Sequence, residues 1–518
     1  MVAVTIYDGA ETIGGNKIFV DGGRYGYFLD FGRNFKKYGQ YFEEFLKARD
    51  TRGLHDPLTL ELLPRIRVYR DDLLPGDAPP LKRLSVPLVA VIVSHAHLDH
   101  CGHIGILDSR IPIVTTPTTA AILKGMQDCG RASLDTCLAY GAPRSRGDDP
   151  RYLPSSKATI PFQGREFLLT APPTEELKGF LAYRPGASGP RARGLCAGAC
   201  CQYGEHAFPF RVFPFEVDHS IYGACAFVIE DDTTIAYTGD IRFHGRFERE
   251  TGRFLDRARD ASVLIMEGTR AGDPTPGRVS EQDVAEQCRA VVEEAPGLVI
   301  ADFGPRNFER LESFLEIAVS TGRALVVPAK DCYMLRSIET VDGVCRTGSN
   351  LLVYREVGSD DRNERRWETE MTECDEAPCY VDPVEIRNDP ARFILCFSFY
   401  DMKHLLDIKP DSGTYIYSAC EAFNEEMVID FQRLWTWLCR FDFSVHGFHL
   451  DRETYGDDRP RFDPRFHASG HAHPSDLTTI VDRVDPDHLI PVHTERQDWF
   501  AEQFENVVLM RDGETRAF

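Results

Sequence analysis

The chain has 518 residues, 42% of them hydrophobic, so it is long and apolar enough to bury a large core and to form two or more domains. A formal net charge of -22 argues against a broadly basic protein that coats nucleic acid, although a site loaded with metal cations can still attract phosphate groups. The 15 cysteines, an odd number, argue against a disulfide framework, and no signal peptide or membrane-spanning run is evident, so we expect a cytoplasmic protein without membrane contact.

The N-terminal half predicts short β-strands, several of which end in a polar residue. Asp21-Gly22-Gly23 is a hairpin signal between two apolar-aromatic runs, and Asp30 ends the second of them. A second hairpin turns at Asp231-Asp232, and its second strand leads into Gly239-Asp240. The predicted strands are residues 17–20, 25–31, 88–93, 224–230 and 233–238.

The pattern changes to alternating strands and helices after residue 297. Residues 298–301 and 324–327 predict strands, and the helix between them has Phe308, Leu311 and Leu315 on one face, which makes a βαβ unit. Ser280 with Asp283 resembles a capping box at the start of a preceding helix. A further helix is predicted near residues 424–440, and the predicted loops are residues 141–150, 184–194 and 359–366.

Four residues of metal-ligand type fall within six positions directly after the strand at residues 88–93. They are His95, His97, Asp99 and His100. In a helix or a strand, side chains at these four positions cannot all point at one cation. The spacing therefore favours two cations side by side. Imidazole and carboxylate ligands together favour zinc or manganese over calcium.

Three further residues complete the predicted metal site, because each lies next to a predicted strand. Taken singly, His219, Asp240 and His493 would be read as surface or turn residues. Two divalent cations with four to five ligands each need about seven protein groups and a shared water. The predicted ligands are His95, His97, Asp99, His100, His219, Asp240 and His493.

The motifs of the chain resemble those of metallo-β-lactamase-fold nucleases of the β-CASP group, and within it the sequence is most similar to ribonuclease J. The similarity extends over nearly the whole chain. The motifs that carry it are Gly9-Ala10-Glu11-Thr12-Ile13-Gly14-Gly15-Asn16, Leu29-Asp30-Phe31-Gly32, the His95 to His100 motif, His219, Thr238-Gly239-Asp240, Met266-Glu267-Gly268-Thr269-Arg270, Ser469-Gly470-His471-Ala472 and Pro491-Val492-His493-Thr494-Glu495.

The resemblance implies an α/β fold, namely an αββα metallo-β-lactamase sandwich with an inserted α/β β-CASP domain that contains a parallel sheet and covers the metals. Residues 1–275 would form the first part of the sandwich, residues 276–444 the β-CASP insertion, and residues 445–518 the completion of the sandwich.

The resemblance also implies two Zn²⁺ ions, with Mn²⁺ as an alternative, and a role for each site residue. Asp30 would orient the metal-binding loop, and Glu267 would pair with His471 at the scissile phosphate. The structural alternatives are an ordinary strand-end acid for Glu267 and a brace for a metal ligand for His471. One zinc would be held by His95, His97 and His219, the other by Asp99, His100 and His493, and Asp240 would bridge them; the catalytic set would be Asp99, Asp240, Glu267 and His471.

The expected chemistry is hydrolysis of a phosphodiester by a water that two metals activate. Such a water attacks at neutral pH, the metals spread charge over the phosphorus, and a histidine held by a carboxylate can protonate the leaving sugar oxygen. DNA-cutting relatives of the Artemis type characteristically replace the last histidine, whereas this chain retains His493, so RNA is the favoured substrate.

The residues that would seat the RNA phosphates are less clear in the sequence. The serine that ribonuclease J relatives use in the lid is missing, which leaves the preference for a 5' end open, and Arg306 and Arg310 have a helix-start alternative. The Arg/Cys-rich segment 184–201, with Arg191 among its arginines, is expected to be a flexible loop rather than a zinc site. The candidate phosphate contacts are Arg306, Asn307, Arg310, Ser469, Gly470 and Ala472.

The function that follows is that of a zinc-dependent ribonuclease in RNA processing or decay, a 5'-to-3' exonuclease with endonuclease activity as a second mode. One alternative is a DNA nuclease or a small-nucleotide phosphodiesterase of the same fold. An alternative of another class is a catalytically silent RNA-binding subunit, which the intact ligand set disfavours. The oligomeric state stays open, with a homodimer among the possibilities.

Overall fold

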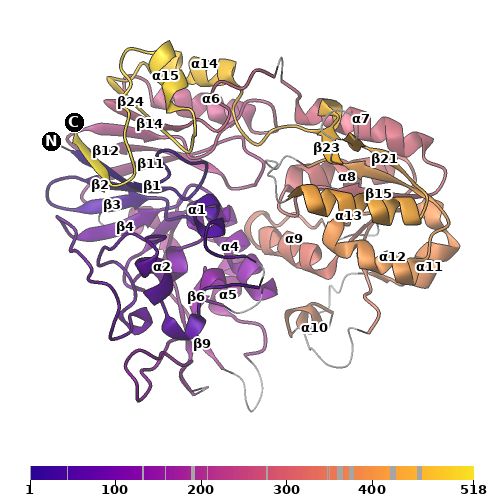
Figure 1. The fold of residues 1–518 in the computed structure, drawn as a ribbon, viewed down its shortest axis with the longest axis horizontal. Coiled ribbons are helices and arrows are strands. Elements are labelled where there is room, and N and C mark those ends of the chain that lie inside the picture. The colour runs from indigo at the N-terminus through magenta and orange to yellow at the C-terminus, as the bar shows by residue number, and fades with distance from the viewer. Residues whose placement is uncertain are drawn as a thin grey trace.

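A computed structural model gives a mixed α/β fold with two lobes, one built on two sheets and the other on a third (Figure 1). Both chain termini lie in the first lobe (Figure 1). The structure describes residues 2–43, 45–130, 133–157, 159–187, 193–206, 208–275, 278–346, 348, 350–358, 366–372, 379–419, 427–451 and 458–518.

The first sheet of the two-sheet lobe has eight strands and combines an antiparallel edge with a parallel remainder. The first strand of the chain pairs antiparallel with the last strand on one side and with the predicted hairpin on the other, and the second strand of the hairpin starts the parallel part. In spatial order the strands are β10 (Cys200–Gln202), β8 (Phe167–Leu169), β5 (Ile113–Thr115), β4 (Leu88–Ile92), β3 (Gly26–Leu29), β2 (Lys17–Asp21), β1 (Ala3–Asp8) and β25 (Glu514–Ala517).

The second sheet has five strands, and its last strand comes from near the C-terminus. The predicted hairpin at residues 224–238 is present, and the strand after it pairs in parallel with the C-terminal one, so that Glu267 lies opposite Val492. This pairing places Glu267 beside His493 at one sheet edge. The strands are β11 (Arg211–Glu216), β12 (Cys225–Glu230), β13 (Thr234–Tyr237), β14 (Val263–Glu267) and β24 (His488–Val492).

The two sheets stack face to face with helices on both outer sides. Alternate side chains such as Ile18 and Ile92 meet Phe227 and Ile265 in a fully buried layer between the sheets. This αββα arrangement confirms the predicted sandwich. The helices of this lobe are α1 (Phe35–Gly39), α2 (His55–Thr59), α3 (Leu98–Cys101), α4 (Pro117–Cys129), α5 (Glu175–Ala182), α6 (Glu248–Arg257), α14 (Pro474–Val484) and α15 (Gln497–Gln503).

The second lobe is a parallel sheet of seven strands with helices on both faces, as expected for alternating strands and helices. The predicted capping box of Ser280 and Asp283 is present, and the predicted βαβ unit forms, although a later strand enters between its two strands. The strands in order are β18 (Tyr380–Val381), β17 (Leu351–Tyr354), β16 (Ala324–Val327), β19 (Phe393–Leu395), β15 (Leu298–Asp302), β20 (Gly413–Tyr417) and β21 (Phe443–His446), and the helices are α7 (Glu281–Glu294), α8 (Phe308–Ser320), α9 (Ala329–Asp342), α10 (Arg366–Thr372), α11 (Pro383–Asn388), α12 (Leu405–Ile408) and α13 (Met427–Arg440).

One hydrophobic core runs through both lobes, because α4 of the sandwich packs on α9 of the second lobe. Gly125 of α4 makes the close approach possible, since a Cβ there would lie 2.4 Å from Oγ of Ser337 and 2.9 Å from Sδ of Met334. Among the described helices, none is long and apolar enough to cross a bilayer.

The Arg/Cys-rich segment differs from the expectation of a flexible loop. Its described part forms β9 (Leu195–Cys196) and β10, which pair in parallel with β7 (Phe162–Gly164) and β8. These two strands are short and lie among glycines and cysteines, so the sequence shows no strand periodicity there. They form because they pair with neighbouring strands of the sheet. Arg191, residues 424–426 and nearly all of the predicted loop at residues 359–366 lie outside the described residues.

The loop after β3 lies directly against the metal-type motif through a glycine. Phe31 N donates to the carbonyl of His100 and Arg33 N to that of Leu98, both at 2.9 Å. A Cβ on Gly32, between them, would lie 1.6 Å from the backbone oxygen of Asp99. Only glycine fits this contact, because any side chain would push the two loops apart.

We therefore expect Gly32→Ala to lower the free energy of unfolding by about 1–3 kcal/mol, because the clash is with backbone. Gly179→Ala is the matched control, since that glycine lies in the exposed part of α5 with open space around it, and a gain of about 0.5–1 kcal/mol is expected there. Urea unfolding of both variants beside the parent protein measures the difference. Equal stability of the two variants would contradict the close contact.

Candidate metal centre

The predicted ligands converge because several strands end at one edge of the stacked sheets. β3, β4, β13 and β24 run into the loops that carry Asp30, His95, Asp240 and His493. Asp30 and His493 adopt positive φ angles of 57° and 53°, which turn their side chains at the strand ends. A residue other than glycine in this conformation costs energy, and such strain is typical of functional sites.

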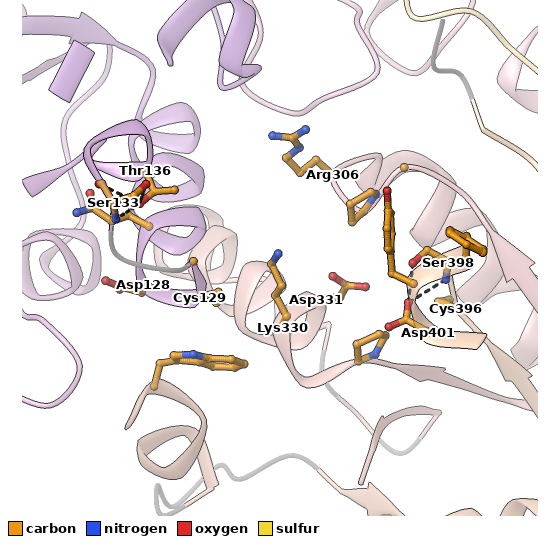
Figure 2. Close-up of a pocket in the computed structure, with 18 of the residues that line it drawn as sticks. Asp128, Cys129, Ser133, Thr136, Arg306, Lys330, Asp331, Cys396, Ser398 and Asp401 are labelled. Atoms are coloured by element: carbon orange, nitrogen blue, oxygen red, sulfur yellow. Dashed lines mark hydrogen bonds between the residues drawn. The ribbon is translucent and has the colours of Figure 1, made fainter. Parts of the chain in front are cut away.

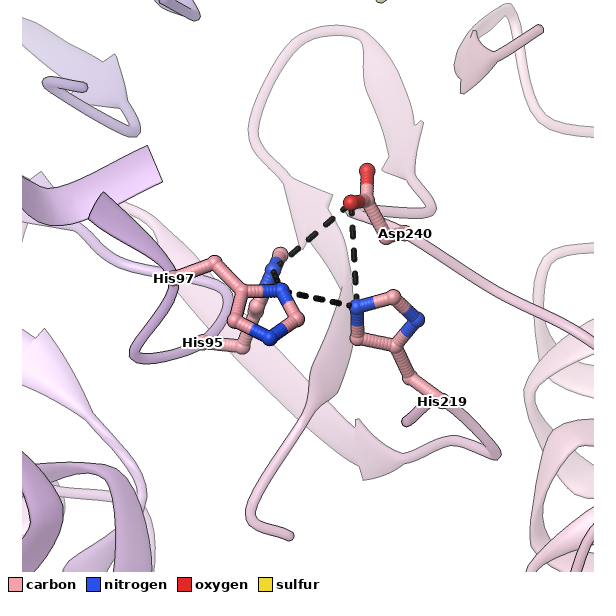
Figure 3. Close-up of side chains that lie close together, drawn as sticks. All are labelled: His95, His97, His219 and Asp240. Atoms are coloured by element: carbon pink, nitrogen blue, oxygen red, sulfur yellow. Dashed lines mark hydrogen bonds and ion pairs between the residues drawn. The ribbon is translucent and has the colours of Figure 1, made fainter. Parts of the chain in front are cut away.

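The first ligand cluster joins residues that are up to 145 positions apart in the sequence (Figure 3). Nε2 of His95 and Nε2 of His219 lie 3.0 Å and 3.1 Å from Nδ1 of His97. Oδ2 of Asp240 lies 3.6 Å from His95 Nε2 and 3.8 Å from His219 Nε2. All four ligand atoms therefore point at one small volume.

The histidines of the first cluster are held in the form that binds metals. Burial, and then the neighbouring histidines, lower the pKa of His95 and His97 well below the usual value. Burial also lowers the pKa of His219 to about 3. Nδ1 of His219 lies 2.6 Å from the carbonyl oxygen of Gly470, so a ring that donates there leaves the Nε2 lone pair free.

The second cluster consists of Asp99, His100 and His493, and it shares Asp240 with the first. Oδ2 of Asp240 lies 3.1 Å from His100 Nε2 and 3.9 Å from His493 Nε2. Oδ2 of Asp99 lies 3.7 Å from His493 Nε2 and 3.9 Å from His100 Nε2. The carboxylate of Asp240 thus occupies the position between the two clusters that a bridging ligand requires.

The donor atoms fit two divalent cations of the zinc or manganese type. Burial alone would raise the pKa of Asp240, but His100, His493 and His471 outweigh it and hold the pKa well below the usual range. Among the described residues, none gives the buried Oδ1 of Asp240 a hydrogen bond, which is an unusual state for a buried carboxylate. Nitrogen and oxygen donors around such an atom are the ligands that zinc and manganese prefer.

The carboxylate of Asp30 lies directly behind the metal-type motif. Its carboxylate accepts hydrogen bonds from Ser94 N at 2.7 Å and from Ser94 Oγ at 2.8 Å. Nδ1 of His100 lies 2.7 Å from Oδ2, and Tyr237 OH donates to the same oxygen at 2.5 Å. This set fixes the ring of His100 with Nε2 toward Asp240.

Glu267 and His471 are paired at the side of the metal clusters. Oε1 of the buried Glu267 lies 3.1 Å from Nδ1 of His471, whose side chain is 21% exposed. Burial alone would lower the pKa of His471, but the charges of Glu267 and Asp240 outweigh it and raise the pKa to about 9. The pair therefore holds a protonated, partly accessible imidazole beside the ligands.

A buried charge network connects the metal loops with the second lobe through Arg242. Its guanidinium contacts Asp218 at 3.2 Å and both Glu281 and Glu309 at 2.8 Å, and all four side chains are buried. Arg242 Nη1 also donates to the carbonyl of Ser469 at 3.1 Å. The guanidinium of Arg242 thus links the segment before His219, the histidine motif and two helices of the second lobe.

The network gives two of the expected phosphate contacts a different role. Arg310 is fully buried, and its guanidinium binds Glu281 and Ser418, so it is not available to a substrate. Asn307 is also buried and caps α8 by accepting from Arg310 N. Arg306 is partly exposed and lines a cavity with Lys330, and its charge is one of the causes that lower the pKa of His97.

The segment Ser469 to Ala472 contributes carbonyl groups and packing. The carbonyl of Gly470 faces His219 and that of Ser469 accepts from Arg242, while Ala472 lies in the core of the sandwich. The carbonyl groups of the segment therefore position other residues, and its His471 N donates to Ser469 Oγ.

Several positioning residues have no signal of their own in the sequence. Ser94, Tyr237 and the Arg242 network were not predicted. The only signal for the network is that the charged residues Asp218 and Arg242 stand next to the ligands His219 and Asp240 in the sequence. His244 Nε2 lies 2.7 Å from the carbonyl oxygen of Ser469. His473 caps α14.

Comparisons with known proteins agree with a metallo-hydrolase. Residues 465–510 match the family described as "Zn-dependent metallo-hydrolase RNA specificity domain". No curated protein matches the sequence. Together with the His/Asp clusters, the family match supports a metal-dependent hydrolase with a domain related to RNA specificity.

Two solved structures describe the extent of structural likeness. A protein of unknown function from Enterococcus faecalis V583 is 22% identical, covers 99% of this chain and 99% of its own, and superposes with a TM-score of 0.65, so it shares the fold. The metallo-beta-lactamase fold protein YhfI from Bacillus subtilis is 14% identical over 52% of this chain and 74% of its own, with a TM-score of 0.23, too low to carry an argument about this chain.

We expect Arg242→Met to lower the free energy of unfolding by about 3–5 kcal/mol, because it leaves the buried carboxylates of Asp218 and Glu309 without their cation. Arg246→Met is the matched control. That side chain is 41% exposed and its ion pairs are worth about 1 kcal/mol or less. Urea unfolding measures both, and a loss for Arg242→Met no larger than for the control would show that the network is not needed.

We expect two metal ions per chain in protein loaded with Zn²⁺ and dialysed, measured by elemental analysis. Asp240→Ala should lower both occupancies because its carboxylate reaches both clusters, whereas His97→Ala should lower only one. His488→Ala, an exposed histidine at the start of β24, is the control and should keep both ions. Full occupancy in Asp240→Ala would exclude a bridging carboxylate.

Proposed function

We propose that this protein is a two-metal ribonuclease of the β-CASP type, similar to ribonuclease J, that hydrolyses RNA phosphodiester bonds in RNA processing or decay. Exonuclease action from the 5' end is the proposed main mode, with internal cleavage as a second. The observation that carries the proposal is the pair of His/Asp clusters that share Asp240 beside the Glu267–His471 pair. The match of residues 465–510 to an RNA specificity domain supports RNA as the substrate.

The proposed domain division follows the chain: residues 1–275 and 445–518 form the sandwich, and residues 276–444 form the β-CASP lid. The proposed first zinc site is His95, His97 and His219, and the second is Asp99, His100 and His493, with Asp240 between them. A cytoplasmic location is part of the proposal, because the chain has many free cysteines, among them the exposed Cys196, Cys345, Cys379 and Cys439.

The residues of the chain supply orientation and proton transfer. When bound, two divalent cations would activate a water for attack and neutralise charge on the phosphate. Asp30 keeps the ring of His100 in place, and the carbonyl of Gly470 does the same for His219. His471, kept protonated by Glu267, is placed to donate its proton to the leaving sugar oxygen, and Glu267 then stabilises its return to the charged form.

A large cavity between the two lobes can receive a polymer, although none of the metal-type ligands lines it. It has a volume of about 1250 Å³ and lies between the end of α4 with the loop after it and the ends of β15, β16 and β19. Figure 2 shows Arg306 and Lys330 directed into this space from the second lobe, facing Ser133 and Thr136 of the sandwich. A small phosphodiester would not need such a space, and the two cations suit phosphate groups.

The decisive measurement is cleavage of one sequence offered as 5'-monophosphorylated RNA, 5'-triphosphorylated RNA and single-stranded DNA, each labelled at the 5' end. We expect mononucleotide release from RNA only. Asp240→Ala should abolish cleavage, whereas His471→Ala should slow it by about 10²–10⁴-fold while both metals stay bound, because only a proton donor is lost.

His473→Ala is the matched control for the last variant, because this histidine caps α14 two residues further along the chain and should leave the rate unchanged. Cleavage of DNA at the same rate would redirect the proposal to a general nuclease. Undiminished cleavage by Asp240→Ala would overturn the mechanism.

A further inference from the structure

The segment from Arg33 to Arg49, here called the aromatic segment, has an unusual composition. It contains five aromatic residues, five basic residues and two acidic residues in a chain whose net charge is -22. Glu44 lies outside the described residues. Aromatic residues interleaved with cations are the composition of surfaces that bind single-stranded nucleic acid.

The aromatic segment keeps its large apolar side chains in solvent. Phe35 is 50% exposed, Tyr41 46%, Phe45 87% and Leu46 60%, and α1 buries none of its residues. Single exposed apolar residues are common, but four within twelve positions form a patch that marks an interaction surface.

Several contacts hold the described residues of this segment. Asn34 caps α1 by accepting from Lys37 N, and Lys37 Nζ is bound by Asp8 at 2.8 Å and by Asp512 at 2.5 Å. The guanidinium of Arg33 lies 3.6 Å from the ring centre of Tyr38. Glu43 Oε1 accepts from Phe45 N and Leu46 N, which fixes the turn that presents Phe45. Such preorganisation lowers the entropy lost on binding.

The aromatic segment begins at the rim of the candidate metal centre. Arg33 N donates to the carbonyl of Leu98, between the ligands His97 and Asp99. Lys36 Nζ lies 2.5 Å from Oε1 of Glu495, two residues after His493. A polymer whose phosphate lies at the clusters therefore has this segment beside it.

We propose that the aromatic segment is a stacking platform for the bases of the single-stranded RNA that the metal centre cuts, an inference that rests on the proposed function for the identity of the strand. The faces of Phe35, Tyr41 and Phe45 would stack on successive bases regardless of sequence. The segment itself has five basic and two acidic residues, so it does not add to the negative charge of the chain.

The rings rather than the charges carry most of this binding. Lys36, Lys37 and Arg49 are each paired with a carboxylate, so few counterions would be released there. The platform should therefore prefer single strands, whose bases are free to stack, over a duplex of the same sequence, whose bases are not.

The test measures binding of a labelled 12-nucleotide RNA, single-stranded or in a duplex, by fluorescence anisotropy in an Asp240→Ala background that does not turn it over. Phe35→Ala, Tyr41→Ala and Phe45→Ala should each weaken single-strand binding by roughly tenfold. Tyr41→Phe retains a ring and should bind like the parent. Tyr152→Ala removes a ring that is 48% exposed elsewhere on the sandwich and is the matched control.

A second measurement separates this inference from the proposed function. In protein with Asp240 intact, the three ring variants should hydrolyse bis(p-nitrophenyl) phosphate at the parent rate, since that substrate is too short to reach the platform. Unchanged RNA affinity in the ring variants would overturn the platform even if the parent cleaves RNA. If the parent protein binds RNA without cleaving it and the ring variants lose that affinity, the platform is supported and the ribonuclease proposal is refuted.

The alternative role of the aromatic segment is an interface between two copies of the chain. Sedimentation velocity decides this: dissociation of a dimer in the ring variants, with RNA affinity unchanged, would assign the surface to self-association and overturn the platform.

Discussion

The carboxylate of Asp240 is the constraint on which the rest of the site depends. One oxygen of this buried group lies within 3.9 Å of nitrogen atoms from His95, His100, His219 and His493, which come from three separate parts of the chain. Because burying so many polar groups is unfavourable unless each has a partner, the surrounding fold has to position every ring, and two cations would complete the set.

The positioning is done by groups behind the ligands. Asp30 fixes His100 on the first sheet, and the carbonyl of Gly470 fixes His219 on the second. Arg242 then joins this layer to Glu281 and Glu309 of the second lobe. Burial alone would raise the pKa of Glu281, but Arg310 and Arg242 lower it to about 2, whereas burial raises the pKa of Glu309 to about 7. The second lobe and the residues behind the ligands are therefore joined by one buried network.

The fold has two surfaces that suit different parts of a nucleic acid. The cavity at the ends of the parallel strands presents Arg306 and Lys330, which suit phosphates. The aromatic segment that begins at Arg33 presents exposed rings, which suit bases. Both surfaces agree with the proposed single-stranded RNA substrate.

The sequence by itself determined the local features of this protein. The spacing of His95 to His100 predicts a metal motif, and strand-end positions together with the motif resemblance pointed to His219, Asp240 and His493, which the structure brings together. The hairpin strands and the capping box of α7 follow from periodicity and turn chemistry, whereas the αββα class was implied by the motif resemblance. These features are local because a ligand motif, a cap or a hairpin is encoded by neighbouring residues.

Only the tertiary structure decided which polar side chains are buried and against what. Arg310 reads as a free cation in the sequence, yet it is enclosed with Glu281, and Arg242 gains three carboxylates from distant segments. The strands β9 and β10 and the exposure of Phe45 likewise depend on which element lies opposite. The physical reason is that burial and ion pairing are properties of contacts between segments, and a single sequence does not state which segments meet.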